Sequence, residues 1–398
     1  MNINILYVKM FQAIAFNNGW INETLNNKMV KFTDNVPWSE NEIDLNTIIE
    51  IQNEFNVVVD TSLSEGRILP VNSGMISLVF HAYSTSKEPL IIKIKRNDID
   101  LKLKEAIEHL KFFIRFLSWI PLVVRYCISE IVETNIELIL EQLDFQREID
   151  NMCLMKENCQ DIGYVKIPYA DKSITLKHPS VIVMERLIGS KISEIKKEDR
   201  EEFAKQIVRI GVVTTFVHGF IHGDLHPGNL LFIKDETDAE NPYKIGLFDF
   251  GIVFKLDKQY QDNVTEVFVK LFVCNCEDDV ISALVLDYFL EPVEIIRNLP
   301  QVHLNHIIKI LSKLGGKVRR FQLVADQKEI LNGFILLDSY LKDNGLLSLG
   351  VKPNKNFVKS QLALAMSHGV TLALCNDEYL KLFCSTIKEM FHIEMFQE

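Results

Sequence analysis

The sequence predicts an α+β chain with two lobes, and two observations lead to this prediction. The hydrophobic pattern has a period of two over residues 77–84 and 90–95, which is typical of strands, whereas most of the remaining chain has the period of an amphipathic helix. In addition, 398 residues are more than one ordinary core holds, so two or three packed lobes are expected. The pattern places the junction of the two lobes near residue 185.

The N-terminal half is expected to begin with helices and continue into a small sheet. Helical patterning covers residues 5–16 and 45–55. A β-hairpin then follows, with strands at 77–84 and 90–95 that are joined by the turn 85–89.

The rest of the chain is expected to be mostly helical around a loop-rich centre. Helical patterning covers 99–149, and a strand over 181–187 ends at Gly189. An amphipathic helix over 203–218 and a short apolar strand over 244–248 flank the central loop. Beyond Leu256 only helices are expected, one of which ends at Gly315 and Gly316.

The composition excludes several classes of protein. With 47% hydrophobic and 24% charged residues, the chain is not expected to be disordered. The 43 basic against 54 acidic residues give a net charge of −11 without a basic stripe, so no nucleic-acid partner is expected. Seven scattered cysteines form no disulfide framework and indicate a reducing compartment.

No signal, transit or transmembrane segment is recognisable, so a cytoplasmic location is expected. The most apolar window, residues 112–128, contains Arg115, Pro121 and Arg125. We favour a buried helical hairpin there over the alternative, a membrane-contacting surface that would allow peripheral association.

The strongest functional signal lies in residues 222–229, which read His-Gly-Asp-Leu-His-Pro-Gly-Asn, followed after a strand by Asp-Phe-Gly at 249–251. Asp224 and Asn229 lie five apart on a turn, and Asp249 ends an apolar strand, so their oxygens can face one point. Hard oxygen donors suit Mg²⁺ held against phosphates. Protein kinases use the same parts, with the first Asp as the base and the Asn and second Asp as metal ligands. The alternative is a solvated loop with a chance Asp-Phe-Gly.

Further kinase parts lie upstream. Of a glycine-rich nucleotide loop only Gly74 and Val79 remain. Lys93 lies on a buried apolar run, where a charge needs partners, and phosphate oxygens together with Glu148 on a predicted helix would provide them. We therefore expect catalytic roles for Lys93, Glu148 and Asp224, although Lys93 could instead be an edge-strand lysine that extends to solvent.

Three features depart from ordinary protein kinases. Gly223 precedes Asp224 where kinases have arginine, and no Ala-Pro-Glu follows Asp249. More than fifty residues separate Lys93 from Glu148, so an insertion is expected there. An activation segment shaped for peptide substrates is therefore not expected.

Together these motifs resemble the UbiB-type atypical kinase-like proteins (the ADCK group), which support ubiquinone and related isoprenoid-lipid metabolism. The family signature K-x-G-Q is similar to Lys-Met-Phe-Gln at 9–12, with Phe11 in place of glycine, and the alanine-rich loop to residues 70–82. The run V-A-V-K-V-Q-R is similar to 90–96, E-L-D-F-x-x-E-A-x-N to 142–151 and the V-M-E hinge to 183–185, while H-x-D-x-H-P-G-N is met in full.

The resemblance implies a two-lobed protein-kinase-like fold and further site residues. Residues 1–65 would form an N-terminal helical extension, 66–188 an N-lobe with a small antiparallel sheet and a helical insert, and 189–398 a helical C-lobe. Nucleotide contacts are implied for Gly74, Val79, Lys93, Glu185 and Leu187, metal binding for Asn229 and Asp249, and a regulatory role for Lys9 and Gln12.

The sequence thus predicts an enzyme, an ATP- and Mg²⁺-dependent atypical kinase or ATPase (phosphotransferase) of the UbiB type. Its cofactors would be ATP or ADP with Mg²⁺, and its role would lie in isoprenoid-quinone or lipid metabolism, with a lipid or membrane surface and lipid-pathway proteins as candidate partners. One alternative is a small-molecule phosphotransferase of the aminoglycoside or choline kinase type, which has the same H-G-D-x-H-P-G-N loop. Another is a non-catalytic nucleotide-binding scaffold.

Other polar clusters give weaker signals. His218, His222 and His226 are four apart, but Gly219 and Gly223 break a helix there, so imidazoles that order the loop are favoured over a zinc site. Cys-x-Cys at 274–276 is expected to be reduced core cysteine, and the acidic run 235–240 a solvated loop tip.

Overall fold

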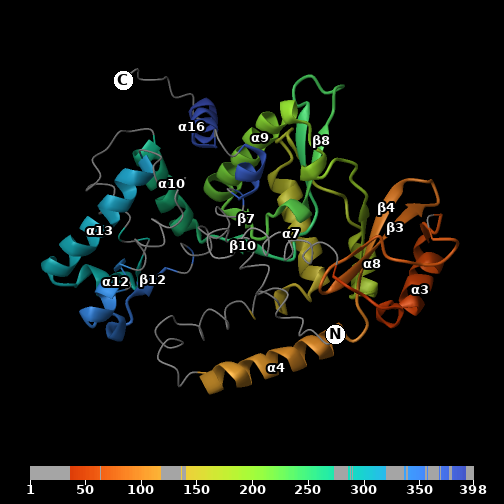
Figure 1. Ribbon diagram of the computed structural model, residues 1–398, viewed down its shortest axis with the longest axis horizontal. Coiled ribbons are helices and arrows are strands. Elements are labelled where there is room, and N and C mark those ends of the chain that lie inside the picture. The colour runs from red at the N-terminus through yellow and green to blue at the C-terminus, as the bar shows by residue number, and fades with distance from the viewer. Residues whose placement is uncertain are drawn as a thin grey trace. The chain divides into compact units, whose positions relative to one another are not determined.

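The hairpin expected from the alternating pattern forms the centre of a five-stranded antiparallel sheet. In the computed structural model, β3 (Ser77–Ser84) pairs with β4 (Pro89–Lys95) in the register Phe80 to Ile92 (Figure 1). The strand order is β1-β3-β4-β6, with β2 paired to β3. The outer strands are β1 (Val57–Val59), β2 (Asn72–Ser73) and β6 (Val181–Glu185).

The structure describes residues 36–62, 64–117, 136, 140–272, 286, 288, 290–319, 336–337, 339–354, 356, 367, 369–375 and 379–390. It divides into two compact units, Met1–Glu194 with Pro227–Ile252 and Ile195–His226 with Val253–Glu398. The predicted helix 5–16, Lys9, Gln12 and Cys-x-Cys at 274–276 lie outside the described residues, as does most of 112–128. The predicted division at residues 65 and 188 stays a prediction.

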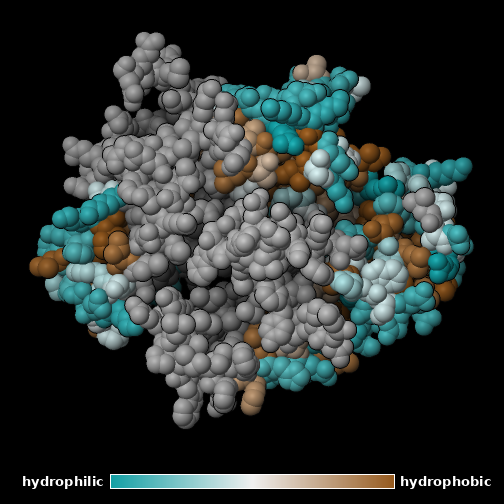
Figure 2. Space-filling view, in the orientation of Figure 1, coloured by the Kyte–Doolittle hydropathy of each residue, from teal (hydrophilic) through white to brown (hydrophobic). Residues whose placement is uncertain are grey.

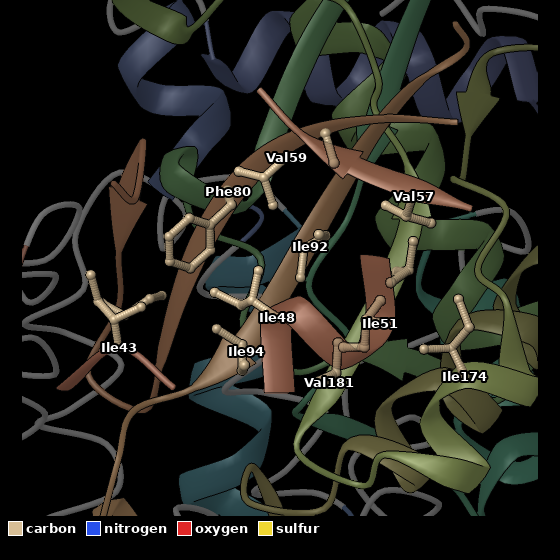
Figure 3. Packing of buried hydrophobic residues seen from close by; sticks show 13 residues of the cluster. Ile43, Ile48, Ile51, Val57, Val59, Phe80, Ile92, Ile94, Ile174 and Val181 are labelled. Atoms are coloured by element: carbon tan, nitrogen blue, oxygen red, sulfur yellow. The ribbon is translucent and has the colours of Figure 1, made fainter. Parts of the chain in front are cut away.

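One face of the five-stranded sheet carries the core of the first unit. Alternation along β3 and β4 places apolar side chains on this face, and the helix α3 (Leu45–Phe55) covers it. Each fully buried Leu, Ile or Phe side chain here contributes about 1.5–3 kcal/mol. Figure 3 shows this packing, and the fully buried members from these elements are Ile48, Ile51, Leu78, Phe80, Ala82, Ile92 and Ile94.

The opposite face of the sheet carries the polar residues of interest. Because side chains alternate along β4, Lys93 and Lys95 lie on the face opposite to Ile92, and the register pairs Val79 with Lys93. The helix α7 (Phe145–Asn158) brings Phe145 to this face, since the ammonium groups of both lysines lie over its ring at 5.5 and 5.7 Å. The prediction that Glu148 lies on a helix is therefore confirmed.

The remaining elements of the first unit complete its frame. The insertion after β4 begins with α4 (Ile99–Leu117), and a three-stranded sheet has the order β5-β9-β8. Strand β6 ends at Glu185, two residues earlier than expected. The other elements are η1 (Glu40–Glu42), β5 (Val165–Lys166), α8 (Lys172–Lys177), η2 (Ile192–Glu194), η5 (Pro227–Asn229), β8 (Leu230–Lys234) and β9 (Tyr243–Leu247).

The second unit is mainly helical. The helix expected over 203–218 is α9 (Arg200–Val212), which continues as one π-helical turn, η4 (Val213–Val217). Strands β7 (Phe220–His222) and β10 (Val253–Lys255) pair after it. The other elements are η3 (Lys197–Asp199), α10 (Lys258–Phe272), α12 (Val293–Arg297), α13 (Gln301–Arg319), η6 (Leu347–Leu349) and α16 (Tyr379–Met390).

Two predictions for this unit are wrong. Residues Gly315 and Gly316 do not end a helix, because α13 runs on to Arg319. Glycine costs about 1 kcal/mol in a helix interior relative to alanine, and packing of the apolar face of α13 outweighs that cost. The region beyond Leu256 also contains two short strands, β11 (Leu290–Glu291) and β12 (Lys352–Pro353).

Among the residues that the structure describes, none of the helices combines the length and the apolar character that a bilayer crossing requires. On the face shown in Figure 2, apolar and hydrophilic residues of the described part lie interspersed.

Candidate active site

Lys93 is the centre of a buried ion-pair cluster in the first unit. Its Nζ lies 2.6 Å from Oε1 of Glu148 and 3.2 Å from Oδ2 of Asp249. The side chain of Glu148 is 1% exposed and that of Asp249 is 31% exposed. The structure thus brings together three residues that belong to three separate sequence motifs, and the expected partnership of Lys93 with Glu148 is present.

Burial and charge oppose each other in this cluster. Burial by itself lowers the pKa of Lys93, but the carboxylates of Asp249 and Glu148 outweigh it and hold the pKa above its usual range. Burial raises the pKa of Glu148 to about 7, although Lys93 acts in the other direction. When ionised, the cluster contains one cation and two carboxylates, so an added positive charge would be stabilised there.

Asn229 and Asp249 lie at the same end of the β8–β9 pair. The register joins Leu230 to Leu247, and Asn229 directly precedes the first of these residues while Asp249 follows the second by two positions. Asn229 is 7% exposed, and Oδ1 of Asp249 accepts a hydrogen bond from the Gly251 amide at 3.2 Å. An amide and a carboxylate at one sheet end form a donor set that fits Mg²⁺, which prefers oxygen ligands.

The Asp-Phe-Gly segment is tied to α7 on both sides of Phe250. The amide of Phe250 donates to Glu148, and its carbonyl oxygen accepts from Nδ2 of Asn151 at 3.1 Å. Phe250 is fully buried. Asn151 belongs to the motif at 142–151, but no role was predicted for it. Its spacing of three residues from Glu148, on one helix face, is the signal that indicates one.

The expected nucleotide loop is a tight turn between β2 and β3. The amide of Gly74 donates to the carbonyl oxygen of Ser77 at 2.8 Å. Val79 is half-buried and lies opposite Lys93 on the neighbouring strand. Arg96, which was not predicted from the sequence, binds the carbonyl oxygen of Gly74. In the sequence Arg96 is visible only as the basic residue that ends the run 90–96, three positions after Lys93.

The expected hinge residues lie where β6 ends. Oε1 of Glu185 lies 3.2 Å from Nζ of Lys166, and its Oε2 accepts from the Tyr169 amide at 3.2 Å. Leu187 packs on β9, since a Cβ on Gly246 would lie 3.1 Å from Leu187 Cδ1. Contact of Glu185 and Leu187 with a nucleotide stays a prediction.

Asp224 belongs to the second unit, where it follows β7. Its amide donates to Nδ1 of His222 at 3.2 Å, and Nε2 of His226 lies 3.7 Å from its Oδ2. For His222 and His226 these contacts agree with the expectation that the imidazoles order the loop, and the role expected of His218 stays a prediction. The described residues contain no cluster of three or more His, Cys, Asp or Glu side chains suited to a metal ion. The catalytic role of Asp224 stays a prediction, as do the regulatory roles of Lys9 and Gln12.

The turn that leads into β7 depends on a glycine. Gly219 has a φ of +58°, and a Cβ there would lie 2.8 Å from Oε1 of Gln261. Nε2 of Gln261 donates to the carbonyl oxygens of Phe216 and Val217 at 3.0 and 2.6 Å. Gln261 on α10 therefore holds the π-helical turn that precedes Asp224.

A strand lysine paired with a helix glutamate and with the aspartate of Asp-Phe-Gly defines a kinase-like protein. Residues 31–281 match the ABC1 atypical kinase-like domain, and the chain belongs to this family. The resemblance to UbiB-type atypical kinases and the mixed helix-and-sheet, kinase-like fold class predicted from the sequence are confirmed.

Two relatives and one solved structure illustrate the similarity. The chain is 25% identical over 281 residues to a protein of Shewanella sp. (strain MR-4) named "Probable protein kinase UbiB", covering 67% of this chain and 48% of the relative. It is 29% identical over 248 residues to an "Uncharacterized protein in hydrogenase 1 5'region" of Clostridium pasteurianum, covering 60% and 44%. The chain therefore spans about half the length of these relatives.

The solved structure is the complex of Rv3197 with erythromycin from Mycobacterium tuberculosis. It is 16% identical, with a TM-score of 0.52 over 95% of this chain and 90% of that one. At this identity the likeness concerns the fold alone.

Proposed function

We propose that this chain is an ATP- and Mg²⁺-dependent atypical kinase or ATPase of the UbiB type that acts in, or regulates, isoprenoid-quinone or lipid metabolism. The observation that carries the proposal is Lys93, buried between Glu148 and Asp249. A buried cation with two carboxylates is what an active kinase needs to hold phosphate oxygens beside a metal ion.

Each residue of the site has a role in this proposal. Lys93 binds the α- and β-phosphates, and Glu148 holds its ammonium in place. Asn229 and Asp249 would hold Mg²⁺, which when bound with ATP neutralises charge on the phosphates. Asp224 accepts the proton of the attacking hydroxyl or water.

The remaining nucleotide contacts come from two segments of the first unit. Gly74 and Val79 border the phosphates, and Glu185 and Leu187 border the base. Lys9 and Gln12 would regulate access to the site, as the family resemblance implies.

Two sequence features support a non-peptide acceptor. There is no arginine before Asp224 and no Ala-Pro-Glu after Asp249, so nothing in the sequence provides the usual platform for an extended peptide. Positioning supplies about 7–11 kcal/mol of the catalysis in such reactions. We therefore expect slow ATP hydrolysis that a lipid surface or an isoprenoid-like phenol accelerates. A cytoplasmic location with peripheral membrane association belongs to this proposal.

Family membership and the retained residues disfavour the two alternatives. The match to the ABC1 domain favours a UbiB-type protein over a phosphotransferase of the aminoglycoside or choline kinase type. A non-catalytic scaffold would be expected to have lost Lys93, Asp224 or Asp249, and all three are present.

Release of ADP from Mg·ATP, with and without lipid vesicles or a prenylated phenol, tests the proposal. We expect Asp224→Ala to abolish turnover, whereas Asp262→Ala, an exposed aspartate on α10, leaves it unchanged. Equal turnover in Asp224→Ala would contradict the proposed role. Efficient phosphorylation of a peptide library that depends on Asp224 would place the protein among conventional kinases instead.

A further inference from the structure

Arg96 follows directly after β4 and is only 5% exposed. Its Nε and Nη2 donate to the carbonyl oxygen of Gly74 at 3.0 and 2.7 Å. Nη1 donates to the carbonyl of Pro37 at 3.1 Å and to Oε2 of Glu42 at 2.7 Å, and Nη2 donates to the carbonyl of Val36 at 3.2 Å. A guanidinium has five N–H donors, so these contacts use its full capacity.

The contacts of Arg96 fix backbone positions more than they neutralise charge. Burial lowers the pKa of Arg96, and only the carboxylate of Glu42 opposes this effect. Every other acceptor is a backbone carbonyl oxygen. A lysine could pair with Glu42, but its single ammonium lacks the planar fork that reaches two chain segments at once.

The two segments that Arg96 joins also contact each other directly. We call residues 72–77 the nucleotide loop and residues 36–43 the support segment. The Val36 amide donates to the carbonyl of Ser73 at 2.9 Å, and Oγ of Ser73, which is fully buried, donates to the carbonyl of Val36 at 2.6 Å. The nucleotide loop is therefore bonded to the support segment beside the guanidinium.

The carboxylate partner of Arg96 is itself held in place. The Ser39 amide donates to Oε2 of Glu42 at 3.2 Å in a capping box at the start of η1, and Nζ of Lys102 on α4 lies 3.4 Å from Oε1. The guanidinium thus stands between a fixed carboxylate on one side and the carbonyl of Gly74 on the other.

We propose that Arg96 is a positioning residue for the nucleotide loop and couples it to the support segment, so that nucleotide binding orders both. This inference rests on the proposed function, because it requires that a nucleotide binds at the loop. A ligand that restrains the carbonyl of Gly74 also restrains the guanidinium, and through it the carbonyls of Val36 and Pro37. Because Arg96 binds both the nucleotide loop and the support segment, a ligand that orders the first also restricts the motion of the second.

Titration of the full chain with Mg·ADP, together with amide hydrogen exchange, tests this coupling. In the wild type we expect the nucleotide to slow exchange in both residues 72–77 and residues 36–43. In Arg96→Lys we expect binding about 10-fold weaker. At saturating nucleotide the variant should keep protection in 72–77 and lose it in 36–43. The control is Arg67→Lys, whose side chain is 66% exposed and 4.0 Å from Glu40, and which should behave as the wild type.

The possible results separate this inference from the proposed function. If the wild type binds Mg·ADP but protects only 72–77, or if Arg96→Lys binds and protects like the wild type, the coupling is refuted and the proposed function stands. If the wild type binds no nucleotide at millimolar concentration, both are refuted. Should Arg96→Lys not fold, the wild-type exchange measurement decides alone: normal binding of Mg·ADP without added protection in 36–43 would refute the coupling.

Discussion

Replacing Lys93 by methionine tests whether one buried cation holds the ion-pair cluster together. Methionine keeps an unbranched apolar stem but lacks the ammonium that lies 2.6 Å from Glu148 and 3.2 Å from Asp249. Removing one partner of a buried ion pair costs about 3–5 kcal/mol of unfolding free energy, because the charge that remains is uncompensated. We expect a loss of this size at pH 8.

The loss should be smaller at pH 5, because Glu148 can then take up a proton. Burial raises the pKa of Glu148 to about 7, so the carboxyl group is mostly neutral at pH 5 and no longer requires a cation. For the same reason, adding Glu148→Gln to Lys93→Met should recover part of the loss at pH 8, and the two substitutions should not be additive.

Lys95→Met is the matched control for this experiment. Lys95 lies on the same face of β4, but its partner Asp100 is 3.4 Å away with a side chain that is 60% exposed. Such a pair contributes about 0–1 kcal/mol. Urea unfolding at both pH values, followed by circular dichroism, measures the differences. The reasoning is refuted if Lys93→Met lowers the free energy of unfolding by no more than Lys95→Met at pH 8. It is also refuted if the losses caused by Lys93→Met and Glu148→Gln simply add in the double variant.

Three further outcomes are expected. First, burial raises the pKa of Glu148 from 4.5 to about 7, so between these pH values the folded state binds a proton that the unfolded state does not. The free energy of unfolding of the wild type should therefore fall by up to about 3 kcal/mol, relative to Glu148→Gln, as the pH rises from 4.5 to 7. Parallel pH profiles of the two proteins in urea unfolding would contradict this. Second, Asn151→Leu removes a donor to the buried carbonyl of Phe250 and should cost about 1–3 kcal/mol and reduce ATP turnover, whereas an unchanged melting temperature would exclude a contribution to stability. Third, Gly74→Ala should leave the stability of the ligand-free protein unchanged or raise it by about 0.4–1 kcal/mol, because a Cβ there meets only ordinary contacts. Gly219→Ala should lower the stability by more than about 1 kcal/mol, because Gly219 has a φ of +58°. Equal shifts of the two melting temperatures in calorimetry would contradict this difference.

Sequence pattern predicts those parts of the fold that short-range periodicity determines. The pairing of β3 with β4 follows from alternation, since a slip of one residue would turn Phe80 and Ile92 out of the core. The helices α3 and α7 follow from their apolar spacing and are capped by the side chains of Asp44 and Asp144.

The errors occur where tertiary contacts outweigh local propensity. Gly315 and Gly316 stay helical in α13, whose apolar face packs in the core of the second unit through residues such as Ile307 and Leu311. Strands of two residues such as β11 and β12 carry no periodicity, and only their partners make them strands. The helix expected to run to residue 218 ends at Val212 and continues as a π-helical turn, because Gln261, far along the chain, donates to the carbonyl oxygens of that turn.

In the candidate site, too, residues in local motifs were predicted, and residues that depend on tertiary contacts were not. Lys93, Glu148 and Asp249 were predicted because each lies in a motif with its own chemistry. Arg96 was missed because its partners lie 22 to 60 residues away, and only the fold shows that Val36, Pro37 and Gly74 meet there. Asn151 was matched by letter, but its partner lies 99 residues away.

The most direct test of the central claim is Mg²⁺-dependent nucleotide binding by the wild type and by Asp249→Asn, measured as thermal stabilisation and by calorimetry. Asparagine keeps the shape of the side chain and removes one charge from the expected metal site. For the wild type we predict stabilisation by Mg·ADP or Mg·ATP of about 2.7 kcal/mol at a hundredfold excess over Kd, abolished by chelation of Mg²⁺. We predict no such effect in Asp249→Asn and a full effect in Asp161→Asn, which alters an exposed aspartate of the same unit. No stabilisation of the wild type by any nucleotide at millimolar concentration, or equal stabilisation of Asp249→Asn, would contradict the claim.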